Sequence, residues 1–117
     1  MKKKISQIAR EDGRYSSAAI QFVCEGLDRA IKTTSDEPRH ISGQNLCEEL
    51  RRSAVNKWGR LAKLVFNVWG IKTTRDFGEI VYLMIEHKWI SAQPDDSIED
   101  FNEIYDFDLV FKKEFRF

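Results

Sequence analysis

The sequence has few of the residues that catalytic and metal sites use most. Its 117 residues include two histidines, His40 and His87, and neither has a second histidine or a cysteine at ligand spacing. The six glycines are dispersed, so there is no glycine-rich phosphate loop, and the chain contains no HExxH, CxxC or G-x-S-x-G motif. We therefore predict a protein that is not an enzyme and that holds no metal ion or cofactor.

Long apolar runs are also missing. No stretch approaches the roughly 20 apolar residues that are needed to span a bilayer, and the basic start MKKKISQIARED lacks the apolar segment of a signal peptide. Cys24 and Cys47 each fall on a predicted helix, which is typical of free thiols in a reducing compartment. These absences predict a cytoplasmic protein that does not associate with membranes.

What the chain does have is helical periodicity. Hydrophobic residues make up 42% and charged residues 32%, an ordinary globular composition, and the length fits one domain over residues 1–117. Apolar residues recur at helical spacing in five main segments, with a shorter helix predicted after Ser97. The five segments are residues 3–12, 16–32, 42–58, 60–69 and 74–88.

The segment 74–88 is predicted to be the central helix. Thr73-x-x-Asp76 is close to a capping box, and almost every residue from Phe77 to Ile85 is apolar. Such a helix is usually buried over most of its circumference. Gly78 costs a helix about 1 kcal/mol relative to alanine, so we expect another backbone to approach the helix closely at this position.

The segment 60–69 is apolar on several sides. Its pattern predicts an inward face made of Leu61, Leu64, Val65, Val68 and Trp69. Trp58, Trp69 and Trp89 all lie at or just beyond helix ends, where an indole ring typically seals the core and keeps its NH near water. The alternative interpretation is that these tryptophans anchor an interface.

The tail changes period at Tyr105. Aromatic and leucine side chains at 105, 107, 109 and 111 alternate with other residues, which indicates a strand. The fold class we predict is therefore mainly α, a compact bundle of about five helices with a short C-terminal β element. Because an exposed strand favours pairing between chains, a homodimer through residues 105–117 is one expectation. A winged-helix-like α+β fold is the alternative.

The net charge of zero hides a split between the two parts of the chain. Residues 1–75 carry 15 Lys and Arg against 8 Asp and Glu, which gives +7, and residues 76–117 carry 4 against 11, which gives −7. Seven of these carboxylates fall between residues 95 and 108, without the spacing of a calcium-binding loop. We expect this acidic run to dock a basic partner or the basic part of the same chain.

Nucleic-acid binding is the first alternative function. In a winged helix the segment 74–88 would enter the major groove of DNA, next to a basic patch. That segment carries Asp76, Glu79 and Glu86, which phosphates repel, so its charge argues against this function. The basic patch would lie within residues 51–75, with Arg51, Arg52, Lys57, Arg60 and Lys63 as its candidate residues.

Binding of a small anionic ligand is the second alternative. Arg14, Arg39 and His40 are its candidate residues, because cationic side chains from separate segments can converge on one anion. No nucleophile or general base accompanies them, so the pattern indicates binding rather than catalysis.

Four motifs in order resemble the Minf-type family of small bacterial proteins. They are IAREDGRYSSAAIQFVCEGLD, RHISGQNLCEEL, WGIKTTRDFGEIV and DDSIEDFNEIYDFDLVF. The resemblance covers nearly the whole chain and implies a complete, single-domain bacterial protein. It brings no catalytic residues, because no activity is assigned to that family.

Together these observations favour a non-enzymatic module for protein–protein interaction. A protein partner, or a second copy of the chain, would bind through the charged faces or through a groove beside the central helix.

Overall fold

The computed structural model describes residues 3–33, 41–90 and 97–113. Within these residues the fold is all helical, with six α-helices, two 3₁₀ helices and no strand, so the mainly α prediction is confirmed. The elements are α1 (Ile5–Asp12), α2 (Ser17–Thr33), α3 (Gly43–Trp58), η1 (Gly59–Leu61), α4 (Ala62–Trp69), α5 (Thr74–Glu86), η2 (Ile98–Phe101) and α6 (Phe107–Lys113).

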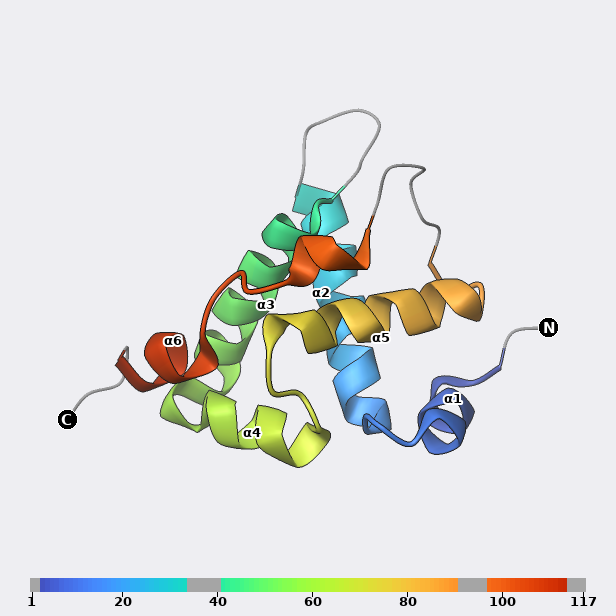
Figure 1. The fold of residues 1–117 in the computed structure, drawn as a ribbon, viewed down its shortest axis with the longest axis horizontal. Coiled ribbons are helices and arrows are strands. Elements are labelled where there is room, and N and C mark those ends of the chain that lie inside the picture. The colour runs from blue at the N-terminus through green and yellow to red at the C-terminus, as the bar shows by residue number, and fades with distance from the viewer. Residues whose placement is uncertain (1–2, 34–40, 91–96, 114–117) are drawn as a thin grey trace.

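The helices pack around α5 and the pair formed by α2 and α3. Helix α2 contacts α1, α3, α4 and α5, while η2 packs on both α5 and α3 (Figure 1). Helix α4 lies at the lower edge of the molecule in Figure 1, with α6 beside it. The Cα radius of gyration, 14.0 Å, is close to the roughly 13 Å of a single compact domain of this length. No described helix is both long enough and apolar enough to cross a bilayer.

Local chemistry sets the starts of α3 and α5 and the end of α4. The Ser42 hydroxyl accepts a hydrogen bond of 3.0 Å from the Asn45 amide, which begins α3. Thr73 and Asp76 form the capping box of α5, in which the Asp76 carboxylate accepts the Thr73 amide at 3.1 Å. Gly70 ends α4 with φ at 89°, a left-handed conformation that glycine adopts easily.

Helix α5 is the interior scaffold of the fold, as its composition predicts. Phe77, Ile80 and Met84 are fully buried, and Val81 and Leu83 are less than a tenth exposed. Close packing at Gly78 is confirmed, but the neighbour is different from the one expected. A Cβ atom at Gly78 would lie 2.7 Å from the Phe101 ring of η2, so a side chain rather than a backbone approaches the helix.

The predicted C-terminal strand is wrong for residues 107–113, which form α6. Phe107 and Phe111 are four residues apart, a spacing that also fits one face of a helix, and both rings contact Phe66. The Asp106 carboxylate accepts the Leu109 amide at 3.2 Å and so begins the helix. This helix removes the basis for strand pairing over the described part of residues 105–117.

The predicted inward face of α4 is also wrong in part. Leu61, Leu64 and Val68 are 53%, 58% and 76% exposed, whereas Ala62 and Phe66 are fully buried. Apolar residues lie on both sides of this short helix, so periodicity alone does not choose the buried side. The side that carries Phe66 turns inward because it meets aromatic rings from α2, α3, α5 and α6.

Candidate functional site

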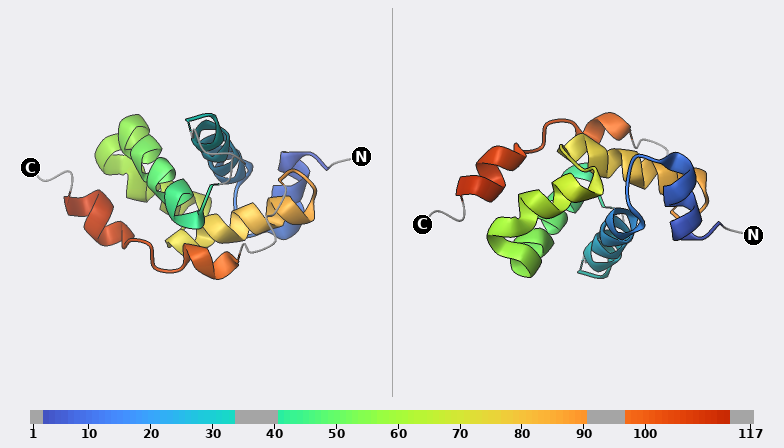
Figure 2. Two further views of the ribbon diagram at one scale, coloured as in Figure 1. Left: turned by 90° about the horizontal axis from the view of Figure 1, so that it is seen from above. Right: turned by 90° about the horizontal axis from the view of Figure 1, so that it is seen from below.

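An exposed apolar row begins at the last residue of η1 and continues along the outer side of α4. We call it the α4 row, and its members are Leu61, Leu64 and Val68. Residues at these spacings fall on one side of a helix. Each of the three side chains is more than half exposed. The view from below in Figure 2 shows the α4 ribbon with no described helix in front of it. The row is therefore a surface that another molecule can cover.

Basic residues flank the α4 row. Arg60 and Lys63 each precede a member of the row by one position, so each lies about 100° around the helix from that neighbour, and Lys63 lines the groove between α4 and the first turn of α5. Lys57, in the last turn of α3, is exposed. Residues 50–75 contain seven Lys or Arg and no Asp or Glu. The apolar surface thus lies within the most basic segment of the chain.

Aromatic packing fixes the position of α4 beneath this surface. The Phe66 ring centroid lies 5.7 Å from that of Phe22, 5.9 Å from that of Trp58 and 5.6 Å from that of Phe77. Trp58 and Trp69 are half-buried and close the edge of the core, in keeping with the core-sealing interpretation. The α4 row is accordingly presented on a rigid support, which lowers the entropy lost on binding.

A groove of about 770 Å³ lies beside the first turn of α5, where we expected a groove along the central helix. Its wall is of mixed charge, because Lys63, Lys72 and Arg75 face Glu103 and Asp106. The two carboxylates oppose the binding of an anion in the same space. The remaining lining residues are Thr73, Thr74, Asn102, Tyr105 and Phe107.

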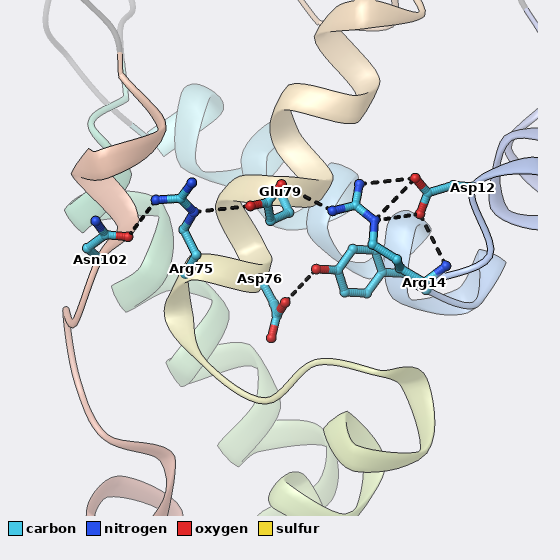
Figure 3. A network of polar contacts seen from close by, with 7 residues as sticks. Asp12, Arg14, Arg75, Asp76, Glu79 and Asn102 are labelled. Carbon is cyan, nitrogen blue, oxygen red and sulfur yellow. Dashed lines mark hydrogen bonds and ion pairs between the residues drawn. The ribbon is translucent and has the colours of Figure 1, made fainter.

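Arg14, a candidate for anion binding, lies in an ion-pair network (Figure 3). Its guanidinium is 3.0 Å from Asp12 and 3.2 Å from Glu79, and Glu79 in turn accepts a hydrogen bond of 3.1 Å from Arg75. The hydrogen bonds that Arg14 donates to Asp12 raise the pKa of Arg14 above its ordinary value. The charge of Arg14 is therefore matched by two carboxylates of the protein itself. Arg39 and His40 lie outside the described residues.

The Asp12 carboxylate is the acidic partner of Arg14 in this ion pair. Partial burial raises its pKa, but the hydrogen bonds from Arg14 outweigh this effect and leave the pKa below the ordinary value. Asp76, on the same surface of α5, accepts a hydrogen bond of 2.5 Å from the Tyr15 hydroxyl (Figure 3). These contacts tie the α1–α2 connection to the first turns of α5.

The residues proposed for nucleic-acid binding do not form one uniform basic face. Arg51 is 3.1 Å from Glu48, and Arg52 is 3.6 Å from Glu49. Lys57 and Arg60 are exposed, and Lys63 lines the groove of mixed charge. Glu79 and Asp76 of α5 take part in the network of Figure 3, and no wing strand occurs in the described ranges.

The acidic run mainly caps helices in the part that the structure describes. Asp100 accepts the Ser97 amide at 3.3 Å in a capping box, and Asp106 begins α6. Asp95 and Asp96 lie outside the described residues. Among the side chains that are described, no three His, Cys, Asp or Glu residues gather as a metal site requires.

Both cysteines are free thiols. Burial raises the pKa of Cys47 to about 12 and that of Cys24 to about 11. A thiol with such a pKa stays protonated at neutral pH and is a poor nucleophile.

Thr74 has a role that the sequence pattern does not reveal. Its side chain is fully buried, donates a hydrogen bond of 2.7 Å to the Phe101 carbonyl and accepts one of 3.1 Å from the Ile104 amide. The capping box predicted from Thr73 and Asp76 assigns no role to the neighbouring Thr74. In the structure Thr73 caps the helix, and Thr74 holds the segment after η2 against α5.

We expect Thr74→Val to lower the free energy of unfolding by about 2 kcal/mol, because the change keeps the side-chain shape but leaves a buried amide and carbonyl without this partner. Urea denaturation measures the effect. Thr33→Val is the control, since the Thr33 hydroxyl donates to the Ala30 carbonyl at an exposed helix end. Equal effects of the two changes would contradict the role given to Thr74.

Comparison with known proteins adds no relative: no family model matches the chain, and no match is found among curated proteins or solved structures. The assignment of function therefore depends on the surface of the molecule.

Proposed function

We propose that this protein is a non-enzymatic module for protein–protein interaction in the bacterial cytoplasm and that the α4 row is its docking surface. The exposure of Leu61, Leu64 and Val68 on one side of α4 is the observation that supports the proposal. Contiguous exposed apolar side chains with a polar rim are characteristic of interaction sites, whereas isolated exposed leucines are not.

The energy available from this surface suits a partner that binds reversibly. Full burial of a leucine or valine side chain contributes about 1.5–3 kcal/mol. Covering three side chains that are half to three-quarters exposed therefore provides roughly 3–5 kcal/mol before the entropy cost of association. This apolar contribution is small, so contacts from the flanking cations would have to add to it. A complex with so little buried apolar surface is transient rather than obligate.

We expect the Leu64→Ser change to abolish capture of the partner from a bacterial lysate. The tagged wild-type protein should retain a specific protein, and the variant should retain at least about tenfold less, because a change of 1.4 kcal/mol alters affinity tenfold. Asn67→Ser is the matched control, since Asn67 is exposed on the same helix but outside the row. Mass spectrometry of the retained proteins provides the measurement.

The same capture experiment, repeated after nuclease treatment, distinguishes protein binding from nucleic-acid binding. Nuclease treatment should leave the retained protein in place, because the contact is between proteins. Loss of retention after nuclease treatment would assign the basic residues to nucleic-acid binding instead. Equal capture by Leu64→Ser and wild type, or no capture by either, would overturn the assignment of the α4 row.

A further inference from the structure

The groove beside the first turn of α5 contains a lysine and a glutamate whose side chains have no partner among the described residues. We infer that this groove binds an extended peptide segment that carries one acidic and one basic side chain at nearby positions. The site is separate from the α4 row, because Leu61, Leu64 and Val68 do not line it. The inference therefore stands or falls independently of the function proposed for that row.

Lys72 is the cation of the groove that a ligand can use. It is exposed on the connection between α4 and α5, and its ammonium group makes no ion pair within the described ranges. Arg75 is already engaged, because it donates hydrogen bonds of 3.1 Å to Glu79 and 3.0 Å to Asn102. Lys63 has an interaction partner as well. A carboxylate of the ligand is thus expected to pair with Lys72.

Glu103 is the corresponding carboxylate. It is exposed on the connection between η2 and α6, and its side chain bonds to none of the described residues. Its φ of 49° lies in the left-handed region, where glycine or asparagine fits with less strain than glutamate. Strained conformations of this kind persist mainly where function needs a particular side chain. Because no contact within the described protein accounts for a glutamate here, we assign it to a cation of the ligand.

Charges of both signs restrict what the groove accepts. Glu103 and Asp106 repel phosphates and other polyanions, and Lys72 repels a purely cationic ligand. An apolar ligand would remove these charges from water without compensating them. The connections that carry Lys72 and Glu103 both pass the first turn of α5 (Figure 1), so the two charges reach a ligand from separate segments. A ligand with one charge of each sign satisfies both.

The lining of the groove favours a peptide over a small molecule. Its volume of about 770 Å³ suits either, but small-molecule pockets are lined predominantly by apolar side chains. Here Tyr105 and Phe107 are the aromatic residues, and the rest of the lining is polar or charged. The backbone amides of Glu103 and Tyr105 have no hydrogen-bond partner in the described part of the chain. Main-chain groups of this kind can bond to the backbone of an extended peptide.

A displayed library of short random peptides tests the inference. The intact protein is the bait, and peptides that also bind Lys72→Gln/Glu103→Asn are removed. Asparagine tolerates the left-handed conformation, so this variant should unfold at the same temperature as the wild type or higher. We expect the surviving peptides to share one acidic and one basic residue at a fixed spacing. Their affinity should fall at least about fivefold for Lys72→Glu and for Glu103→Lys, because each change replaces an attraction with a repulsion.

The exchanged variant Lys72→Glu/Glu103→Lys keeps the composition and the net charge of the groove. It should reject the selected peptides and select others in which the acidic and basic positions are exchanged. The matched control is Lys4→Gln/Glu86→Asn, an exposed lysine and an exposed glutamate that do not line the groove. This control should change affinity less than about twofold, because distant surface charges are screened by salt. Leu64→Ser should bind the peptides as the wild type does.

Several outcomes would overturn the inference. Failure to select any peptide would do so, as would survivors that share no pair of opposite charges or that bind Lys72→Glu and Glu103→Lys as tightly as the wild type. Binding of free arginine or free glutamate without binding of any peptide would assign the groove to a small zwitterion instead. If the peptides also need Leu64, the groove is not a separate site and the inference falls. If peptides bind as expected but no Leu64-dependent protein is captured, the inference stands and the proposed function falls.

Discussion

Replacing Phe66 with alanine is expected to lower the free energy of unfolding by about 3–5 kcal/mol, the range for a fully buried phenylalanine. Phe66 has no exposed surface, and its ring contacts aromatic rings on α2, α3, α5 and α6. The residue is therefore the point at which four helices meet α4. Because a domain of this size has a total stability of about 5–15 kcal/mol, the variant should be close to unfolding.

Urea denaturation compares Phe66→Ala with Leu64→Ala, a matched control two residues away on the exposed side of the same helix. The control should change stability by less than about 0.5 kcal/mol, as is usual for surface positions. Hydrogen exchange should also show faster exchange of α6 in Phe66→Ala, since the rings of Phe107 and Phe111 pack on Phe66. Similar stability losses for the two variants would contradict the inward placement of Phe66.

The Gly78→Val change is expected to have the next largest effect, a loss of about 3 kcal/mol from overpacking. The Phe101 ring lies within 2.9 Å of the position that a Cβ atom would take, at its Cγ and Cδ2 atoms. These atoms belong to the base of a buried ring, so they cannot move aside as the end of a flexible side chain can. The helix propensity of valine, a few tenths of a kcal/mol better than glycine, offsets little of the loss.

A double-mutant cycle with Phe101→Leu tests this explanation. A smaller side chain at 101 makes room for valine at 78, so the double variant should be more stable than the sum of the single effects predicts, by about 1 kcal/mol or more. Thermal and urea unfolding of the four proteins provide the data. Additive effects on the free energy of unfolding would mean that a side chain at position 78 does not clash with Phe101.

Much of the fold is predictable because local chemistry determines it. The hydroxyl of Ser42 and the pair Thr73 and Asp76 satisfy amides at helix starts whatever the rest of the chain does. The burial of most residues between 77 and 85 follows from composition, because a helix with so little polar surface is most stable in the interior.

The predictions from the sequence are wrong where one pattern of apolar residues fits two different structures. Alternation from Tyr105 to Phe111 fits a strand, yet Phe107 and Phe111 also share a helical face, and only the position of Phe66 decides between them. In the same way, α4 is apolar on two sides. Tertiary contacts with Phe22 and Phe77 determine which side is buried. Periodicity in the sequence does not show which distant residues will make these contacts.

The candidate site was predictable only in its charges. The sequence predicts a binding surface at Lys57, Arg60 and Lys63, although for nucleic acid, and these residues belong to the same stretch of chain as the α4 row. The row itself was assigned to the core, so its role was missed. The signal that could have revealed it is the excess of apolar residues in α4, since an eight-residue helix at the edge of a domain cannot bury them on every side.

The outward orientation of the α4 row is the central claim of this account, and urea denaturation of the Leu61→Asp/Leu64→Asp variant tests it most directly. Leu61 is the N-cap residue of α4 and Leu64 lies in its first turn, where a carboxylate is compatible with the helix dipole. The account predicts a free energy of unfolding within about 1 kcal/mol of the wild type. A loss of more than about 4 kcal/mol, as expected for two buried leucines replaced by charges, would show that the row belongs to the core and would contradict the account.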